Sequence, residues 1–388
     1  MNLAYIHDHK YYRCNGKVYS AGTMSSAVFS RFFGVADKVT VFSHLIDVDD
    51  VGAINSMTEI DDPRVSFSSL NDFGTCIKLK DRIFLKKRVL KKIEGCDGVV
   101  ARVPGTLTSR YCRYLLRNTT LLVGLEVVGC TFDALWYHGS LKAKLAAIPS
   151  YFLMRNVVRQ AQAVVYVTEG FLQTRYPTAG KSVNASNVVL DSTKGDKAQA
   201  DDRWSKVKYR FGIVGSWDVA YKGHDVLFKS LSQLPKDKFQ LDIVGLGDAN
   251  RIHAMISVNG LTDNVTVVGR LKPGAEMMTW YESLDLLVHP SRTEGLPRSV
   301  IEAMSRGCPV LASSVGGIPE LLPQCRLHSP GDHKALEAQL LEFLENPKSF
   351  NDDVIRNIVR SKDYLSPVLE ERRLVFWQNF FKGNRCSA

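Results

Sequence analysis

The stretch "SRTEGLPRSVIEAMSRGCPVLASSVGGIPEL", residues 291–321, decides the fold of the chain. It holds a Gly-Leu-Pro turn, a helical pattern, a short apolar run and a glycine-rich loop, a rhythm typical of α/β proteins. Because proline is well tolerated in the first turn of a helix, we expect a helix to begin near Leu296 with Pro297 in that turn. Glu294 comes just before this helix and Glu302 lies inside it.

The two glutamates are spaced to bind two parts of one ligand. The free N–H groups of a helix start bind anions, and a diphosphate suits such a site. Glu294 would then lie beside the group that the diphosphate carries, and Glu302 would reach a different part of the ligand. Carboxylates accept strong hydrogen bonds from hydroxyls, so a sugar and a ribose are natural partners. The alternative is that Glu294 caps the helix and Glu302 lies on a solvated face.

Apolar runs and helical patterns alternate on both sides of the opening stretch, which predicts βαβ units in two domains. The predicted strands of the first half are residues 3–6, 38–43, 98–102, 121–129 and 163–168, and those of the second half are 210–216, 239–245, 264–269, 284–290 and 309–313. A polar stretch from about Pro177 to Trp204 reads as a connection between the halves. We expect domains over residues 1–190 and 191–366, with a C-terminal helix over about 367–388 that packs back on the first domain.

The charge of the chain is unevenly distributed. Its formal net charge is +10, and residues 1–175 hold 23 Lys and Arg against 15 Asp and Glu, which gives +8 for that half. This asymmetry predicts a negatively charged surface or ligand facing the first half. The start "MNLAYIHDHK" has no secretory pattern, and the eight cysteines form no C-x-x-C pair. We therefore expect free thiols and a reducing compartment, the cytoplasm.

Residues 78–95, "KLKDRIFLKKRVLKKIEG", predict a basic amphipathic helix. Its eight cations are Lys78, Lys80, Arg82, Lys86, Lys87, Arg88, Lys91 and Lys92. Such a helix can lie on an anionic membrane surface, which would place the protein at the inner face of the membrane. The alternative is a solvated helix whose apolar stripe faces the core. No aromatic stacking platform accompanies the cations, so nucleic acid is not expected.

Two stretches of the second half resemble a known family in order and spacing. "HPSRTEGLPRSVIEAMSRGCPVLASSVGGIPEL" resembles the E-x7-E segment of the retaining glycosyltransferases of family 4, and "GIVGSWDVAYKGHDVLFKSLSQL" resembles their strand, loop and "KG" helix start. "LDIVGLGD", "VTVVGR" and "LDLLVHPS" follow in the family's order. The resemblance covers about residues 160–325 well and the first 150 residues loosely. It implies the α/β GT-B fold, with two Rossmann-like βαβ domains facing each other across a cleft.

The resemblance also implies roles for individual residues. Glu294 corresponds to the glutamate that binds the donor sugar, Glu302 to the one that binds the ribose, and Lys222 to the lysine that neutralises the diphosphate. Amides near Gly295, Leu296 and Pro297 would assist, although proline itself has no N–H. The remaining predicted donor-binding residues are Ser216, Arg270, Arg292, Arg298, Gly245, Gly316 and Gly317. Ser216 or Trp217 stands where the family usually has an arginine, so either Arg292, Arg298 or Arg270 supplies the second cation or the site lacks one.

The first half should bind the acceptor. Asn15 and Gly16 follow the first predicted strand where the family has a glycine-containing loop beneath the donor phosphates, and His7 and His9 are expected to be ordinary loop residues. Many relatives place a histidine after a mid-domain strand, toward the donor sugar. Glu126 is our candidate there, with His138 further on. A charged residue in an apolar strand is costly unless it is paired or used, so the alternative for Glu126 is a strand-end carboxylate that meets a lysine.

These observations predict a retaining glycosyltransferase of the bacterial surface-polysaccharide type. It would move a sugar from a UDP- or GDP-linked donor to a glycan or lipid-linked acceptor. No cofactor and no metal are expected, and the D-x-D at Asp47 and Asp49 lies in the half without the nucleotide pattern. The alternatives are an isomerase or phosphorylase on the same fold, and a basic membrane-binding or nucleic-acid-binding protein with a degenerate donor site.

Overall fold

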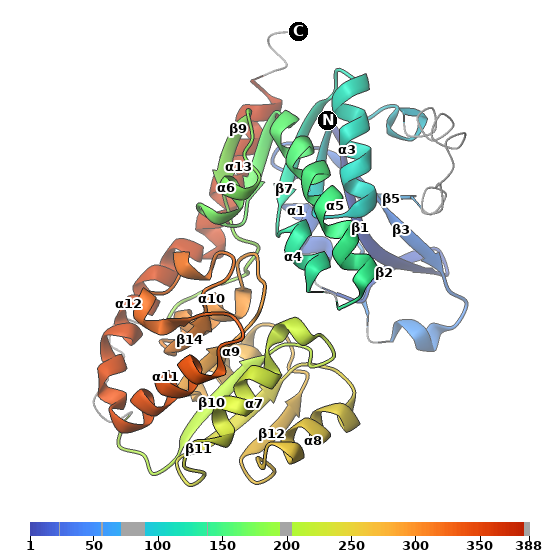
Figure 1. Cartoon of the computed structure of the whole chain (residues 1–388). Coiled ribbons are helices and arrows are strands. Elements are labelled where there is room, and N and C mark those ends of the chain that lie inside the picture. The colour runs from blue at the N-terminus through green and yellow to red at the C-terminus, as the bar shows by residue number, and fades with distance from the viewer. Residues whose placement is uncertain (23, 56, 71–89, 138, 195–203, 384–388) are drawn as a thin grey trace.

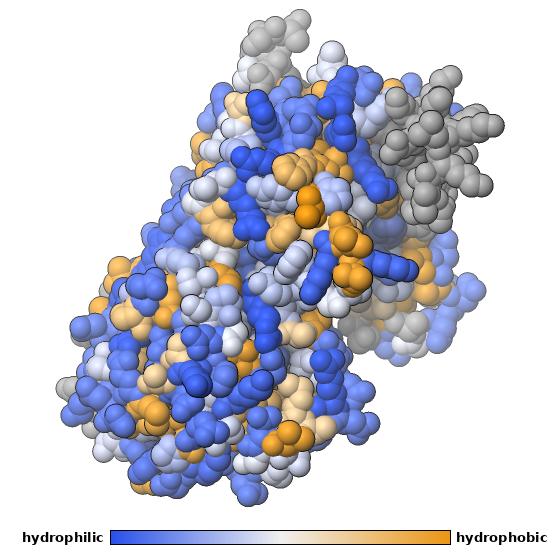
Figure 2. Space-filling model, viewed as in Figure 1, coloured by the Kyte–Doolittle hydropathy of each residue, from blue (hydrophilic) through white to orange (hydrophobic). Residues whose placement is uncertain are grey.

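Two β-sheets, each covered by helices, organise the chain into two α/β domains (Figure 1). The computed structural model describes residues 1–22, 24–55, 57–70, 90–137, 139–194 and 204–383. Most of the predicted basic helix, residues 78–89, lies outside the described residues, and so does His138. On the face seen in Figure 2 hydrophilic side chains predominate, and apolar ones gather on the first domain where helix α5 runs.

The first sheet is mixed, with a parallel core. Its strands are β1 (Asn2–Cys14), β2 (Lys17–Ser20), β3 (Lys38–Asp47), β4 (Thr58–Glu59), β5 (Val65–Ser69), β6 (Gly98–Val103), β7 (Leu122–Val127), β8 (Ala163–Tyr166) and β9 (Lys181–Asn184). The order β5-β3-β1-β6-β7-β8-β9 is parallel throughout, and β2 and β4 add an antiparallel extension to the end of β1. The order reverses beside β1, since β3 lies on one side of it and β6 on the other.

Helices cover both faces of this sheet. They are α1 (Ser26–Ser30), α3 (Thr106–Asn118), α4 (Thr131–Trp136), α5 (Leu141–Gln160) and α6 (Phe171–Arg175), with a 3₁₀ turn η1 (Val51–Ile54). Helix α5 packs on α3 and α4. The carboxylate of Asp8, in β1, accepts hydrogen bonds from the first amides of α3, at Leu107 (3.0 Å) and Thr108 (2.9 Å). A carboxylate of the chain itself therefore occupies that helix start.

The second sheet is parallel along its whole width. Its strands are β10 (Tyr209–Val214), β11 (Phe239–Val244), β12 (Val265–Gly269), β13 (Leu286–His289), β14 (Val310–Ser313) and β15 (Leu327–His328), in the order β12-β11-β10-β13-β14-β15. The helices are α7 (His224–Ser232), α8 (Ala249–Val258), α9 (Ala275–Ser283), α10 (Arg298–Ser305), α11 (His333–Glu345) and α12 (Asn351–Ser361). The 3₁₀ turns are η3 (Ala220–Lys222), η4 (Ile318–Glu320), η5 (Gln324–Arg326), η6 (Pro347–Phe350) and η7 (Lys362–Tyr364).

The last helix, α13 (Ser366–Phe381), returns to the first domain after the whole second domain has been traversed (Figure 1). Trp377 is fully buried and its ring lies 6.5 Å from that of Phe32. Gly124 in β7 makes this packing possible, because a Cβ there would lie 2.5 Å from the Trp377 ring. None of the described helices is both long enough and apolar enough to cross a bilayer.

The domains are joined by polar contacts as well as by the chain. The carboxylate of Glu320, in η4, accepts hydrogen bonds from three backbone amides at the start of α6: Glu169 (2.6 Å), Gly170 (2.9 Å) and Phe171 (2.7 Å). Arg360, in α12, forms an ion pair with Glu169 at 2.7 Å. Glu320 therefore caps a helix of the other domain, and we call this group the Glu320 clamp.

The predicted strands of both halves are present, and the main correction lies in the first loop. Strand β1 does not end after Ile6; it runs to Cys14, so His7 and His9 are strand residues. Asn15 and Gly16 form the two-residue turn to β2, with φ of 49° and 79°. Asn-Gly is the usual sequence of such hairpin turns, because both residues tolerate positive φ. The loop predicted beneath the donor phosphates is therefore an exposed hairpin turn.

Candidate functional site

The site in the second domain lies where its strand order reverses. Strands β10 and β13 are neighbours in the sheet but are far apart in sequence. In open parallel sheets the loops that leave two such strands diverge and form a crevice at the carboxyl ends, where ligands bind. The loop after β10 carries Lys222, and the loop after β13 carries Glu294. The topology alone therefore brings these two predicted residues together.

Lys222, Glu294 and His289 form a connected group at this crevice. Nζ of Lys222 lies 2.8 Å from Oε1 of Glu294, and Nε2 of His289 lies 2.9 Å from the same oxygen. Ser291 Oγ is 3.2 Å from that histidine nitrogen. Strand β13 ends at His289, which is 2% exposed, so the ring is fixed by the core on one side and by the glutamate on the other.

The charge state of Glu294 follows from these partners. Burial acts to raise the pKa of this carboxyl, but the charge of Lys222 and the hydrogen bond from His289 outweigh it. The pKa of Glu294 is therefore held far below its usual range. The carboxylate is an acceptor at every physiological pH, which suits a group that binds sugar hydroxyls.

Helix α10 begins two residues later than predicted. Pro297 has ψ of 119° and is the N-cap, so the first helical residue is Arg298 rather than Leu296. The first intrahelical hydrogen bond is donated by Ile301 to Pro297 O, at 3.5 Å. The three amides at residues 298–300 precede that bond and have no partner within the helix. The donors that the helix start leaves without an intrahelical partner are therefore these three amides, and not those of residues 295–297.

The turn before α10 is a second place, besides the Glu320 clamp, where the second domain approaches the first. A Cβ on Gly295 would lie 2.5 Å from the carbonyl oxygen of Val128, just after β7. Gly317 donates its N–H to Gly295 O at 2.7 Å, and Gly316 packs on the backbone of Glu294. The glycine-rich loop after β14 thus supports the turn that carries Glu294.

Glu302 lies one helical turn beyond the start of α10. Its Oε2 accepts a hydrogen bond of 3.0 Å from the hydroxyl of Tyr281, in α9. Burial raises the pKa of Glu302, although the Tyr281 hydrogen bond and the charge of Arg298 act to lower it. Glu294 and Glu302 are thus held separately, one by Lys222 and His289 and the other by Tyr281.

The three arginines predicted as the second cation of the diphosphate site differ in their contacts and in their exposure. Arg292 forms two hydrogen bonds with the carboxylate of Asp225, at 2.9 and 2.7 Å, and a third with Ala220 O at 2.6 Å. Arg298 is exposed at the first position of α10. Arg270 is exposed just after β12, two strands from the crevice. Arg298 is the cation best placed beside the free amides.

A buried tryptophan fixes the loop after β10, in which the family arginine is absent. Trp217 is 5% exposed and its Nε1 donates to Asp248 O at 2.9 Å, which ties the loop after β10 to the start of α8. Ser216 is partly exposed beside it and accepts the amide of Asp218 at 3.3 Å. Gly245 packs on this loop, with the Ser216 nitrogen 3.4 Å from the place of a Cβ. Of these two residues, Ser216 is therefore the one whose side chain is accessible to a ligand.

Glu126 lies in a buried ion cluster of the first domain. Its Oε2 accepts hydrogen bonds from Tyr5 (2.8 Å) and Arg31 (3.0 Å), with Arg102 at 3.8 Å. Burial acts to raise its pKa, but the charges of Arg31 and Arg102 lower it below the usual value. The carboxylate is 2% exposed, so contact with a sugar would require it to leave these arginines. The partners are arginines, not the lysine that the sequence suggested.

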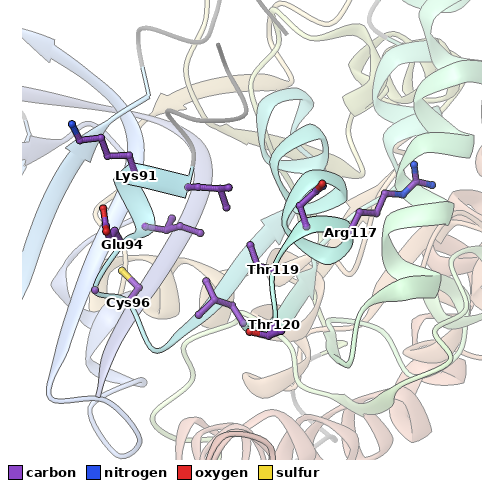
Figure 3. A pocket seen from close by; sticks show the side chains of 11 residues that line it. Lys91, Glu94, Cys96, Arg117, Thr119 and Thr120 are labelled. Carbon is purple, nitrogen blue, oxygen red and sulfur yellow. The ribbon is translucent and has the colours of Figure 1, made fainter. Parts of the chain in front are cut away.

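A hollow of about 1000 Å³ lies at the amino ends of strands β6 and β7 of the first sheet (Figure 3). Its lining includes Lys91, Glu94, Cys96, Arg117, Thr119 and Thr120. These residues directly precede β6 and β7, so they lie at the amino ends of the strands. Ligands of open α/β sheets bind at the carboxyl ends, and we therefore do not assign this hollow to the donor or the acceptor.

Comparison with known proteins identifies the family. The model described as glycosyl transferases group 1 matches residues 208–346, the part that holds the crevice. Protein CapJ of Staphylococcus aureus is 30% identical over 366 residues, which is 92% of this chain and 90% of that protein. The chain belongs to the group 1 glycosyl transferases. The predicted membership of family 4 is thereby confirmed, and so is the prediction that the chain is a glycosyltransferase.

One further relative and one solved structure with a similar fold extend the comparison. AmsK of Erwinia amylovora, an amylovoran biosynthesis glycosyltransferase, is 36% identical over 115 residues, or 27% of this chain and 28% of that protein. The crystal structure of HepE from Anabaena in complex with UDP and glucose has a TM-score of 0.66 and 16% identity, and covers 100% of both chains. The predicted GT-B fold is confirmed.

Sequence reasoning missed several residues that shape the site. His289 ends a predicted strand five positions before Glu294, and its position in "LLVHPS" was a usable signal. Tyr281 and Asp225 come from α9 and α7, and only the folded structure brings them to Glu302 and Arg292. The residues that sequence alone brought together correctly are Lys222 and Glu294.

Proposed function

We propose that this chain is a retaining glycosyltransferase that moves a sugar from a nucleotide-sugar donor to a glycan or lipid-linked acceptor. The reaction would serve cell-surface polysaccharide or glycolipid synthesis. The observation that carries the proposal is the meeting of Lys222 and Glu294 at 2.8 Å, beside the start of α10 and at the strand-order reversal. A carboxylate for hydroxyls and a cation with amides for a diphosphate are the groups that such a donor needs.

The donor would lie across the start of α10. Its diphosphate would accept hydrogen bonds from the amides of residues 298–300. Lys222 would neutralise part of the diphosphate charge, and Arg298 would be the second cation. The sugar would bind Glu294, and the ribose would bind Glu302 on the far side. In binding the diphosphate, Lys222 exchanges a carboxylate partner for a phosphate one, so its charge is never left without a partner.

The transfer would take place on one face of the sugar. The acceptor hydroxyl forms a bond to the anomeric carbon while the bond from that carbon to the diphosphate oxygen breaks. The hydroxyl proton passes to the departing diphosphate oxygen, and configuration at the anomeric carbon is retained. Lys222 and the α10 amides stabilise the charge that develops on the diphosphate, which is the contribution that usually dominates such catalysis. We propose that this stabilisation needs no metal ion.

The nucleotide of the donor is proposed to be uridine or guanosine diphosphate. HepE was crystallised with UDP and glucose, which favours testing UDP first. The acceptor is proposed to be a growing surface glycan or a lipid-linked sugar, in line with the amylovoran role in the name of AmsK. We propose that the enzyme works in the cytoplasm at the inner face of the membrane, and that residues 78–95 contribute to membrane contact.

A binding experiment followed by product analysis tests this function. UDP, GDP and ADP are titrated into the protein by calorimetry, and saturable binding of one of them with a clear preference is expected. With the corresponding nucleotide sugars, NMR of the product should show the same anomeric configuration as in the donor. Absence of base-selective binding to any nucleoside diphosphate would refute the proposal. Release or rearrangement of sugar at equal rates with and without an acceptor would favour a phosphorylase or isomerase.

A further inference from the structure

Helix α5 carries an exposed apolar stripe. Its members are Leu141, Leu145, Ile148 and Phe152, which are 73%, 70%, 55% and 62% exposed. Successive residues of an α-helix turn by about 100°, so these four positions fall within about 60° of one another. Figure 2 shows apolar side chains gathered along the part of the first domain where α5 runs in Figure 1, with hydrophilic side chains beside them.

The stripe is not needed to hold α5 in the fold. The opposite side of the helix buries Ala147, Met154, Val157 and Val158 against the first domain. Large apolar side chains exposed in a row, with a separate buried face on the same helix, mark an interaction surface. Phe132 and Trp136 in the neighbouring α4 extend the apolar area, since their rings stack at 5.3 Å and Trp136 is 40% exposed.

The charged residues of α5 itself are all basic, and Asp133 of the neighbouring α4 is paired with Arg175 at 2.8 Å. Helix α5 contains Lys142, Lys144, Arg155 and Arg159 and has no acidic residue between positions 141 and 160. Nζ of Lys144 lies 5.5 Å from the centre of the Trp136 ring, which joins a cation to the apolar area. Arg159 is exposed and falls on the angular position of the stripe itself. A helix whose exposed apolar residues are accompanied on that helix only by cations suits a surface that is apolar inside and negatively charged outside.

We propose that the apolar stripe of α5 docks on an anionic phospholipid surface. The helix would lie in the plane of the interface, with the stripe among the acyl chains and Lys142, Lys144 and Arg159 against the lipid phosphates. A second copy of the chain fits less well. In a two-fold interface each residue meets the same patch of the partner, so these cations would face one another.

The docked orientation also suits the proposed function, on which this one step rests. Helices α4 and α5 follow β7 directly, and the end of β7 is where Val128 meets the Gly295 turn. The amino end of the stripe therefore lies at the same end of the first sheet as the contact with the Gly295 turn. Docking through α5 would hold a lipid-linked acceptor at the membrane near the residues that bind the donor. This surface is separate from residues 78–95.

Vesicle sedimentation with matched variants of the full chain tests the proposal. The vesicles contain phosphatidylglycerol and phosphatidylcholine in equal parts, or phosphatidylcholine alone. The stripe variant is Leu145→Gln with Phe152→Gln, since glutamine is polar and a good helix former. The control is Val258→Gln with Ile355→Gln, two exposed apolar residues of the second domain (87% and 56% exposed). The charge variant is Lys142→Gln with Lys144→Gln.

The proposal predicts a distinct result for each protein. The unaltered chain and the control should sediment with the anionic vesicles and bind phosphatidylcholine weakly. The stripe variant should lose more than about tenfold in vesicle affinity, because burial of each apolar side chain contributes about tenfold or more. Each cation removed should lower the affinity about fivefold. Thermal unfolding of all variants should match that of the unaltered chain.

Three outcomes would overturn the inference. The first is vesicle binding of the stripe variant that equals that of the control. The second is equal binding of the unaltered chain to charged and uncharged vesicles. The third is a dimer in light scattering that the stripe variant converts to a monomer, which would make the stripe a contact between copies. UDP affinity is measured in parallel: its absence would count against the proposed function and leave the vesicle result standing.

Discussion

Replacing Lys222 by methionine should damage both the folded state and the transfer reaction. Nζ of Lys222 lies 2.8 Å from Glu294 Oε1, and the two side chains are 20% and 13% exposed. At that distance and an effective dielectric constant of about 20, the gross attraction is about 6 kcal/mol. Removing one partner of a buried pair costs about 3 to 5 kcal/mol. Because His289 remains bound to Glu294 at 2.9 Å, we expect a loss of about 3 kcal/mol, at the lower end.

The effect on catalysis has a separate cause. If Lys222 stabilises the departing diphosphate, its removal should lower kcat by about 10²- to 10³-fold, as the loss of one preorganised donor typically does. Lys222→Arg keeps the charge and should restore most of the stability and part of the rate. Urea unfolding measures the first quantity, and initial rates of sugar transfer at saturating donor measure the second.

The reasoning on Lys222 would be refuted by either of two results. A Lys222→Met protein whose kcat stays within about threefold of the unaltered enzyme would show that the lysine does not stabilise the transition state. An unfolding free energy changed by less than about 0.5 kcal/mol would show that the ion pair does not hold the loop after β10 in place. Lys229→Met, in the exposed part of α7, serves as the control for loss of a lysine.

Three further predictions concern the same region and the domain contact. Glu302→Gln should weaken nucleoside diphosphate binding about tenfold in calorimetry, because the hydrogen bond to a ribose hydroxyl would lose its charge, and an unchanged affinity would exclude the ribose role. Burial lowers the pKa of His224 to about 4 in the folded state against 6.5 for the free side chain, so the unfolded chain binds more protons between these pH values and stability falls as pH falls. The loss should reach about 3 kcal/mol at pH 4 in urea unfolding, and His224→Gln should remove that part of the pH dependence. Glu320→Ala breaks the Glu320 clamp; it should lower the unfolding free energy by about 2 to 3 kcal/mol and enlarge the radius of gyration in solution scattering, whereas an unchanged radius would mean that other contacts set the domain arrangement.

Sequence reasoning was most successful where the signal is local and periodic. Each predicted apolar run corresponds to a strand in the structure. A parallel strand with helices on both faces is buried on both sides, so its sequence is a continuous apolar run. Lys222 and Glu294 could be paired from sequence because they occupy fixed places after two such strands. The start of α10 was placed too early because Pro297 fits both the first turn and the N-cap, and only its observed ψ decides between them.

Sequence patterns did not predict the contacts between segments that are distant in the chain. The polar run after Ile6 looked like a loop, yet it pairs with β3 and continues the strand. Its Asn-Gly pair signals a hairpin, and the family pattern was given more weight than that local rule. The arginines around Glu126 come from positions 31 and 102, and the amides that Glu320 binds come from the other domain. No spacing in the chain encodes these meetings, because they depend on how whole elements pack.

The return of α13 to the first domain has a consequence for biosynthesis. Trp377, Phe380 and Phe381 are buried on the first sheet, but they leave the ribosome only after all strands of the second domain. Until then the apolar face beside Gly124 has nothing to cover it, whereas the second domain already holds every strand and helix of its own sheet. During synthesis the domain that is made first is therefore completed last, and its uncovered face is where a chaperone would act on the nascent chain.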